Sequence, residues 1–206
     1  MIHNRTLTSP RIMDKVRRMR HQAAIITVCL AVAGCGRAVT EKAHSPQVDD
    51  ERSAVPAPEW TAGIIDQPRP DLPAASLVVV RTGTHEGFDQ VVFEFDERVP
   101  GYHTEYIDQP VRKCGSGEVT DLAGDGWLEV RMYPVNAHTE EGQPTVADRE
   151  RMPNLPVLSE LELTCDFEAV VTWVFGVESP NRYRVRELSS PPRLVVELRH
   201  GRNHSN

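Results

Sequence analysis

Residues 169–199 read AVVTWVFGVESPNRYRVRELSSPPRLVVELR, and this stretch decides the fold. Its first nine residues are almost all apolar, which is typical of a central strand buried on both faces. Two segments follow, 182–188 and 193–199, in which apolar and polar side chains alternate. Alternation with a period of two predicts strands that turn one face to a core and the other to water. Pro and Asn residues between the segments predict turns, so the stretch should form three consecutive strands.

Five further segments upstream show the same short apolar or alternating patterns: 76–82, 89–97, 102–108, 127–133 and 160–165. Each is bounded by Gly, Pro or Asp residues, which favour turns. About eight short strands with regular turns indicate an all-β domain, a sandwich or a barrel. Helix signals are weak, because the one candidate turn, within 147–152, is followed directly by Pro153 and soon by Pro156.

The first 35 residues have the layout of a lipoprotein signal peptide. Three arginines between residues 17 and 20 give a basic start, and an uncharged apolar run, 23–33, follows. Its eleven residues would rise only ~16 Å as a helix, too little to span a hydrocarbon core of ~30 Å. The run ends in Val32-Ala33-Gly34-Cys35, which resembles a bacterial lipobox. We therefore expect cleavage and lipidation at Cys35; the alternative is an ordinary signal peptide with a chance cysteine.

Residues 36–74 have the composition of a linker, with six prolines, many charged residues and few large apolar ones. Proline blocks both helices and strand pairing, so this stretch should be extended and flexible. A coil of this length spans ~35 Å root-mean-square. The predicted globular domain then covers residues 75–201, and residues 202–206 form a short tail.

The charge of the chain limits its partners. Residues 1–35 hold six Lys or Arg and one Asp, so the net charge of −7 becomes −12 once they are removed. An acidic protein is repelled by nucleic-acid phosphates and by anionic headgroups, so we expect membrane attachment through the lipid alone. The residue after Cys35 is Gly36 and not the Asp that retains lipoproteins at an inner membrane. This favours the outer membrane if the cell has one, and otherwise the outer face of the plasma membrane.

Two of the four cysteines remain for the folded domain. Cys29 leaves with the signal and Cys35 takes the lipid, so Cys114 and Cys165 are left over in an oxidising compartment. Neither belongs to a CxxC motif or has a histidine close by, so the spacing does not fit a metal site. We therefore predict a disulfide between them; the alternative is two free thiols.

Several motifs of the domain recur in a known family. They are DFE at 166–168, WVFGV at 173–177, YRV at 183–185 and PRLVVEL at 192–198, together with GFDQVVFEF at 87–95 and PGY at 100–102. Over roughly residues 76–200 the chain resembles AMIN-like domains, although Glu197 stands where we expect Asp and the cysteine pair lies outside the family pattern. The resemblance implies a single compact β-sandwich in a bacterial envelope protein. The related AMIN domain is thought to target cell-wall enzymes by binding peptidoglycan. The family implies no catalytic residues and no cofactor.

Arginines near the C-terminus are the best candidates for ligand binding. Three share one face of a predicted strand and two lie on the outward side of the next one: Arg182, Arg184, Arg186, Arg193 and Arg199. Guanidinium groups bind carboxylates bidentately, and peptidoglycan stem peptides are rich in carboxylates. The competing interpretation is cross-strand pairing with Glu160, Glu162 or Glu197, worth ~0.2–1 kcal/mol per pair.

Two other groups of residues have side chains that could form a site. His85, Glu86, His103 and Glu105 are possible zinc ligands, but they lack any metal-site spacing, so we predict solvated surface residues and no metal. Six aromatic residues could stack on sugar rings: Trp127, Trp173, Tyr102, Tyr106, Tyr133 and Tyr183. Most of them fall on the apolar side of a predicted strand, so core packing is the better interpretation.

Together these features predict a non-catalytic, lipid-anchored envelope protein that binds peptidoglycan or another cell-wall component. The alternative is an envelope scaffold that binds proteins and not the wall. An enzyme would need a cluster of polar side chains in a cleft, and the sequence offers no persuasive one.

Overall fold

The computed structural model describes residues 58–201, in which all regular structure is β-strand. The predicted signal, Cys35 and the tail 202–206 lie outside the described residues. Within residues 58–201 no helix has the length and apolarity needed to cross a membrane. The strands are β1 (Ile65–Gln67), β2 (Ala75–His85), β3 (Phe88–Phe95), β4 (Gly101–Ile107), β5 (Val111–Arg112), β6 (Val119–Thr120), β7 (Gly126–Tyr133), β8 (Val135–Asn136), β9 (Glu150–Arg151), β10 (Leu158–Phe167), β11 (Val170–Val177), β12 (Tyr183–Ser189) and β13 (Pro192–Arg199).

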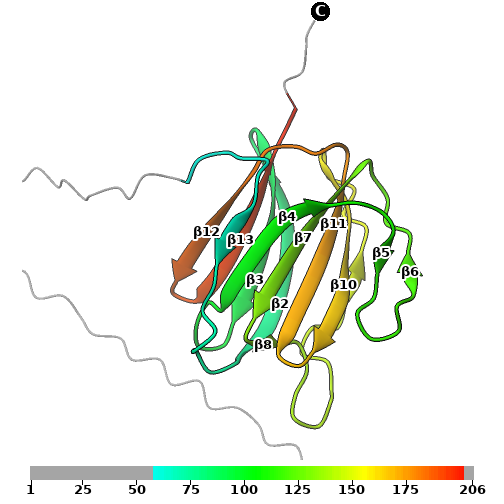
Figure 1. The fold of residues 1–206 in the computed structure, drawn as a ribbon. Coiled ribbons are helices and arrows are strands. Elements are labelled where there is room, and N and C mark those ends of the chain that lie inside the picture. Colours follow the sequence, from blue (N-terminus) through cyan, green and yellow to red (C-terminus); the bar gives the residue numbers. More distant parts are fainter. Residues whose placement is uncertain (1–57, 202–206) are drawn as a thin grey trace, which may run out of the picture. The chain divides into compact units, whose positions relative to one another are not determined.

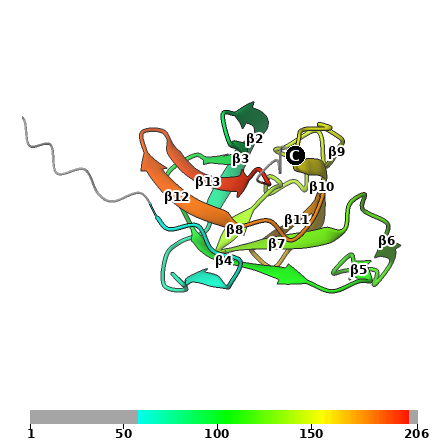
Figure 2. The ribbon, with the colours of Figure 1, turned by 90° about the horizontal axis from the view of Figure 1, so that it is seen from above.

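Two sheets form the layers of a sandwich (Figures 1 and 2). One sheet has six strands in the order β1-β4-β7-β11-β10-β9, and the other has five in the order β12-β13-β3-β2-β8. Neighbouring strands are antiparallel except β2 and β8, which pair in parallel. The predicted all-β sandwich is therefore confirmed.

The eight predicted strands correspond to the eight long ones, from β2 to β13. The five additional strands, β1, β5, β6, β8 and β9, have only two or three residues each, too few to show a periodic pattern. One of them, β9, lies within the candidate turn at 147–152 and pairs with β10. β11, predicted as a central strand, lies between β7 and β10 and is buried from Val171 to Val177.

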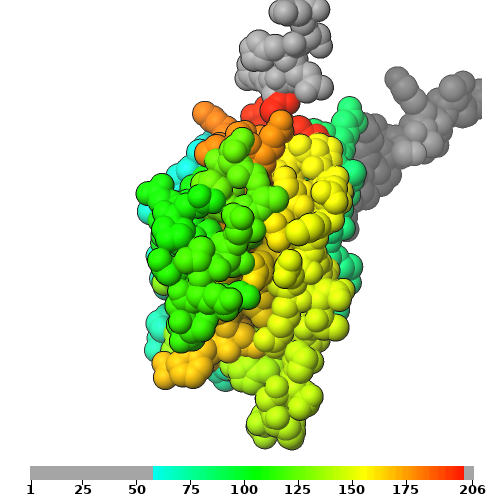
Figure 3. All heavy atoms as spheres, turned by 90° about the vertical axis from the view of Figure 1, so that its right-hand side faces the viewer, coloured from blue at the N-terminus to red at the C-terminus, as the bar shows by residue number. Residues whose placement is uncertain are grey.

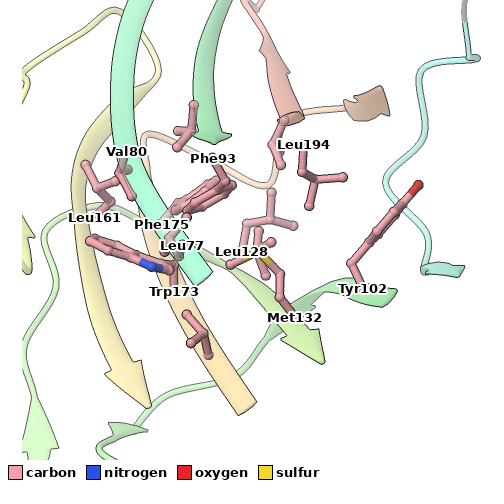
Figure 4. Close-up of a cluster of buried hydrophobic side chains, with 14 of the residues drawn as sticks. Leu77, Val80, Phe93, Tyr102, Leu128, Met132, Leu161, Trp173, Phe175 and Leu194 are labelled. Carbon is pink, nitrogen blue, oxygen red and sulfur yellow. The ribbon is translucent and has the colours of Figure 1, made fainter. Parts of the chain in front are cut away.

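The core lies between the two sheets and consists of the apolar positions of the alternating strands. Trp173 and Phe175 of β11 and Phe93 of β3 are fully buried, and Phe93 contacts both partners at ring-centroid distances of 6.1 Å (Figure 4). Burying an aromatic or aliphatic side chain of this size contributes ~1.5–3 kcal/mol. The sequence pattern identified these inward positions correctly on β3, β7 and β13.

The last part of the predicted linker belongs to the folded domain. Residues 65–67 form β1, which pairs with β4, and Thr61 exchanges two backbone hydrogen bonds with Tyr183 of β12 at 2.9 and 2.7 Å. The predicted linker boundary at residue 74 is therefore too late. Proline content alone was misleading, because the prolines at 68, 70 and 73 follow β1 and do not interrupt it.

Residues 108–125, which include β5 and β6, form a flap over the outer face of the six-stranded sheet (Figure 3). Val111 and Leu122 of the flap pack against Val174 of β11 and form a small second core. A disulfide joins Cys114 of the flap to Cys165 of β10, with the two Cα atoms 5.2 Å apart, as predicted from the cysteine count. The residues of β10 shift register between Leu163 and Cys165, and Cys165 is partly exposed.

Candidate functional site

A group of arginines covers the outer face of the five-stranded sheet. Leu194, Val196 and Leu198 of β13 point into the core, so the residues between them point outward. By the same register this face carries Arg182, Arg184 and Arg186 beside and on β12, Arg193 and Arg199 on β13, and Arg81 on β2. We call these six side chains the basic face. Glu94 and Glu197 lie on the same side of the sheet, so the arginines outnumber the glutamates there. This face is therefore positively charged, although the protein as a whole is acidic.

Three members of the basic face are paired within the sheet, and one of them is Arg81, which lies 2.7 Å from Glu94. Glu197 of β13 is only 1 % exposed, and the guanidinium of Arg184 donates a hydrogen bond to it from the neighbouring strand. Nε of Arg186 lies 3.5 Å from the second carboxylate oxygen of Glu197. A buried carboxylate needs such partners, so Arg184 and Arg186 have a structural role.

The competing interpretation, cross-strand pairing with Glu160, Glu162 or Glu197, is confirmed for Glu197, and these arginines do not pair with Glu160 or Glu162. Both of these glutamates lie on β10 in the other sheet, buried beneath the flap. Glu160 accepts a hydrogen bond of 2.8 Å from the amide of Ala123, and Glu162 lies 3.0 Å from Nζ of Lys113. This ion pair raises the pKa of Lys113.

Three arginines of the basic face remain available to a ligand. Among residues 58–201, no carboxylate lies within salt-bridge distance of Arg182, Arg193 or Arg199. Arg193 donates to the backbone oxygens of Pro191 and Ser190 at 3.3 and 3.5 Å. Arg182 and Arg199 line a hollow of about 320 Å³ with Asn181, His200 and Gly201.

An aromatic cluster adjoins this hollow. The guanidinium carbon of Arg184 lies 4.4 Å from the ring centroid of Trp60, and that of Arg199 lies 5.8 Å from it. Trp60 also contacts Phe88, which stacks on His85 at a centroid distance of 4.9 Å. Arginine over an aromatic face contributes ~0.5–1 kcal/mol at exposed sites, so the cluster fixes Arg184 in place. A lone tryptophan in a proline-rich segment was the sequence signal for this contact, and the sequence analysis missed it.

The buried carboxylate of Asp89 is hydrogen-bonded to His200, which lines the hollow. Nε2 of His200 lies 2.9 Å from Oδ1 of Asp89, whose side chain is fully buried. The other carboxylate oxygen of Asp89 accepts hydrogen bonds from the amides of Val157 and Leu158 at 2.6 and 3.0 Å. Burial by itself would raise the pKa of Asp89, but these hydrogen bonds outweigh it and the pKa is lowered. An aspartate on the apolar side of a strand was the signal for this pair.

The remaining candidates from the sequence are separated by the fold. His85 belongs to the five-stranded sheet and His103 to the six-stranded one, where His103 lies 3.0 Å from Asp66 and 3.2 Å from Glu105. In the described part of the chain no three His, Cys, Asp or Glu residues are arranged to hold a metal ion. Five of the six aromatic candidates are buried or partly buried, as predicted, and the sixth, Tyr133, is 43 % exposed.

The comparison with known families agrees with this architecture. The AMIN-like domain family matches residues 75–200, which include every long strand of the sandwich and all six arginines of the basic face. No curated protein and no solved structure matches the chain. The match covers more than half of the 206 residues, and the chain therefore belongs to the AMIN-like domain family.

Proposed function

We propose that this is a lipid-anchored envelope protein whose domain binds peptidoglycan through the basic face. AMIN-like domains are cell-wall-related and generally non-catalytic, which supports an envelope location and a cell-wall partner. The observation that carries the proposal is the set of three arginines without a carboxylate partner among residues 58–201. Carboxylates of the stem peptides would complete the hydrogen bonding of Arg182 and Arg199 in their shared hollow.

Pelleting of the purified mature domain with isolated cell walls tests this proposal. We expect Arg182→Ser with Arg199→Ser to weaken binding about tenfold at low salt, since two exposed ion pairs contribute up to ~1 kcal/mol each. The difference should shrink at high salt, where charges are screened. Arg184 is unsuitable for the test, because its removal would leave the buried Glu197 without its closest partner.

The matched control is Arg98→Ser with Arg112→Ser, which removes the same number of positive charges outside the basic face. Equal losses in both double variants would mean that net charge and not the basic face determines binding. A domain that captures envelope proteins but does not pellet with walls would favour the alternative, a protein-binding scaffold.

The lipid anchor is a separate part of the proposal, and it rests on the lipobox that ends at Cys35. Cys35→Ser should prevent lipidation and release the protein into the soluble fraction, because a covalent lipid supplies the membrane affinity. Cell fractionation at high salt measures this. A variant that still sediments with membranes would show that another segment provides the attachment.

A further inference from the structure

Of the six aromatic candidates from the sequence, Tyr133 is the one that contributes to neither the core nor the basic face. Of the other five candidates, Trp173 and Tyr183 are fully buried, and Tyr106 donates its hydroxyl to the backbone oxygen of Asn181 at 2.7 Å. Tyr102 is 9 % exposed, and Trp127 packs against the second core under the flap. Tyr133 stands at the end of β7 on the outer face of the six-stranded sheet, with 43 % of its surface exposed.

Tyr133 lines a small hollow on that face. The hollow measures about 160 Å³, and Pro68 and Pro70, from the segment that follows β1, line it together with Tyr133. Gly101 lets this segment approach, because a Cβ atom there would lie 2.5 Å from the backbone nitrogen of Arg69 and 2.8 Å from the backbone oxygen of Tyr133. Any side chain at position 101 would push the segment with Pro68 and Pro70 away from the sheet.

Polar side chains on the same face also line the hollow. Asp66, His103 and Arg131 belong to adjacent strands and lie in one row across the sheet. Oδ1 of Asp66 contacts Nδ1 of His103 at 3.0 Å, and a single guanidinium nitrogen of Arg131 bonds to Glu129 at 3.0 Å. The side chains of Asp66 and Arg131 are 55 % and 52 % exposed, so an acceptor oxygen and several N–H donors face solvent.

We propose that this hollow binds one sugar ring of a glycan strand. A sugar ring has an apolar C–H face that suits the exposed ring of Tyr133, and hydroxyl groups around its edge that suit Asp66 and Arg131. The volume is well below the ~300 Å³ at the lower end of drug-sized ligand sites, which fits a single ring. A proline-rich peptide also packs on tyrosine, but it needs a longer groove and few charged partners.

The inference rests on the proposed wall binding, and it assigns the glycan part of that polymer to a second surface away from the basic face. The probe is a soluble tetramer of N-acetylglucosamine, which carries no peptide and no carboxylate. Titration of the isotope-labelled mature domain, followed by amide NMR shifts, should show changes confined to β1, β4 and β7 near Tyr133. Tyr133→Ala should weaken binding of the tetramer at least tenfold, whereas Tyr133→Phe should preserve it.

Phe167→Ala is the matched control, because Phe167 is an aromatic residue even more exposed than Tyr133, at 61 %, on a different part of the same sheet. Unperturbed shifts of core amides verify that Tyr133→Ala is folded. Tetramer binding that persists in Tyr133→Ala, or binding of a polyproline peptide in place of the tetramer, overturns the inference. Wall pelleting without tetramer binding overturns it and leaves the proposed function intact. Tetramer binding without wall pelleting supports the glycan site and overturns the proposed binding of peptidoglycan through the basic face.

Discussion

Replacing Cys114 and Cys165 with alanine is expected to lower the free energy of unfolding by up to ~4 kcal/mol. The bond closes a loop of 51 residues, and chain entropy predicts a loss of this size when such a crosslink is removed. That is a large share of the ~5–15 kcal/mol of a typical domain. Urea unfolding of the double variant measures it. Wild type in a reducing buffer should show the same loss, and the double variant should not respond to the reductant.

The position of the disulfide predicts where the variant loosens first. The bond fastens the flap next to the hydrogen bond from the amide of Cys114 to the backbone oxygen of Thr164, at 3.0 Å. Under the flap lie Glu160 and Glu162, two carboxylates whose burial depends on flap atoms as partners. Without the crosslink, the amide hydrogen of Ala123 should exchange with solvent faster than it does in wild type. The increase should be larger for Ala123 than for the core amides of β11. Equal exchange in wild type and variant, with an unfolding loss below ~1 kcal/mol, would contradict this role.

The long strands could be predicted because each carries its own pattern. On β3 the alternation placed Val91, Phe93 and Phe95 inward correctly, but it did not predict the buried Asp89 on the same side. The same reasoning failed for Glu160 and Glu162, which occupy the outward side of β10 as predicted but are buried by the flap. The local sequence of β10 does not predict the flap, because the hydrogen bonds between the flap and β10 join segments about forty residues apart in the chain.

The candidate site shows the same division between local and distant information. The outward direction of Arg184 and Arg186 follows from strand alternation, but their partner could only be narrowed to three glutamates. The order of strands decided between them, since β12 and β13 are neighbours and β10 lies in the other sheet. The contact between Trp60 and Arg184 could not be predicted for a similar reason, because it depends on the path of the chain before β1.

Asp89→Ala is expected to destabilise the domain by ~2–6 kcal/mol, because two buried amides lose their hydrogen-bond acceptor. Asp89 links β3 to two other parts of the chain: the amides of Val157 and Leu158 at the start of β10, and His200 after β13. Truncation leaves both amides without their acceptor, and each unsatisfied buried group costs ~1–3 kcal/mol. Asp89→Asn, which keeps an acceptor oxygen of the same shape, should lose less. Urea unfolding at neutral pH compares the three proteins.

The stability lost in Asp89→Ala should also depend on pH. Burial would raise the pKa of Asp89, but its hydrogen bonds to His200, Val157, Thr84 and Leu158 lower it below the value in the unfolded chain. A lowered folded-state pKa stabilises the protein above the unfolded pKa of ~3.9 and stops doing so as the pH falls through the folded value. The stability difference between wild type and Asp89→Ala should therefore be full at neutral pH and shrink below about pH 4. Unfolding free energies at pH 7 and pH 3 measure this, and a difference that stays constant would show that the charge of Asp89 does not contribute.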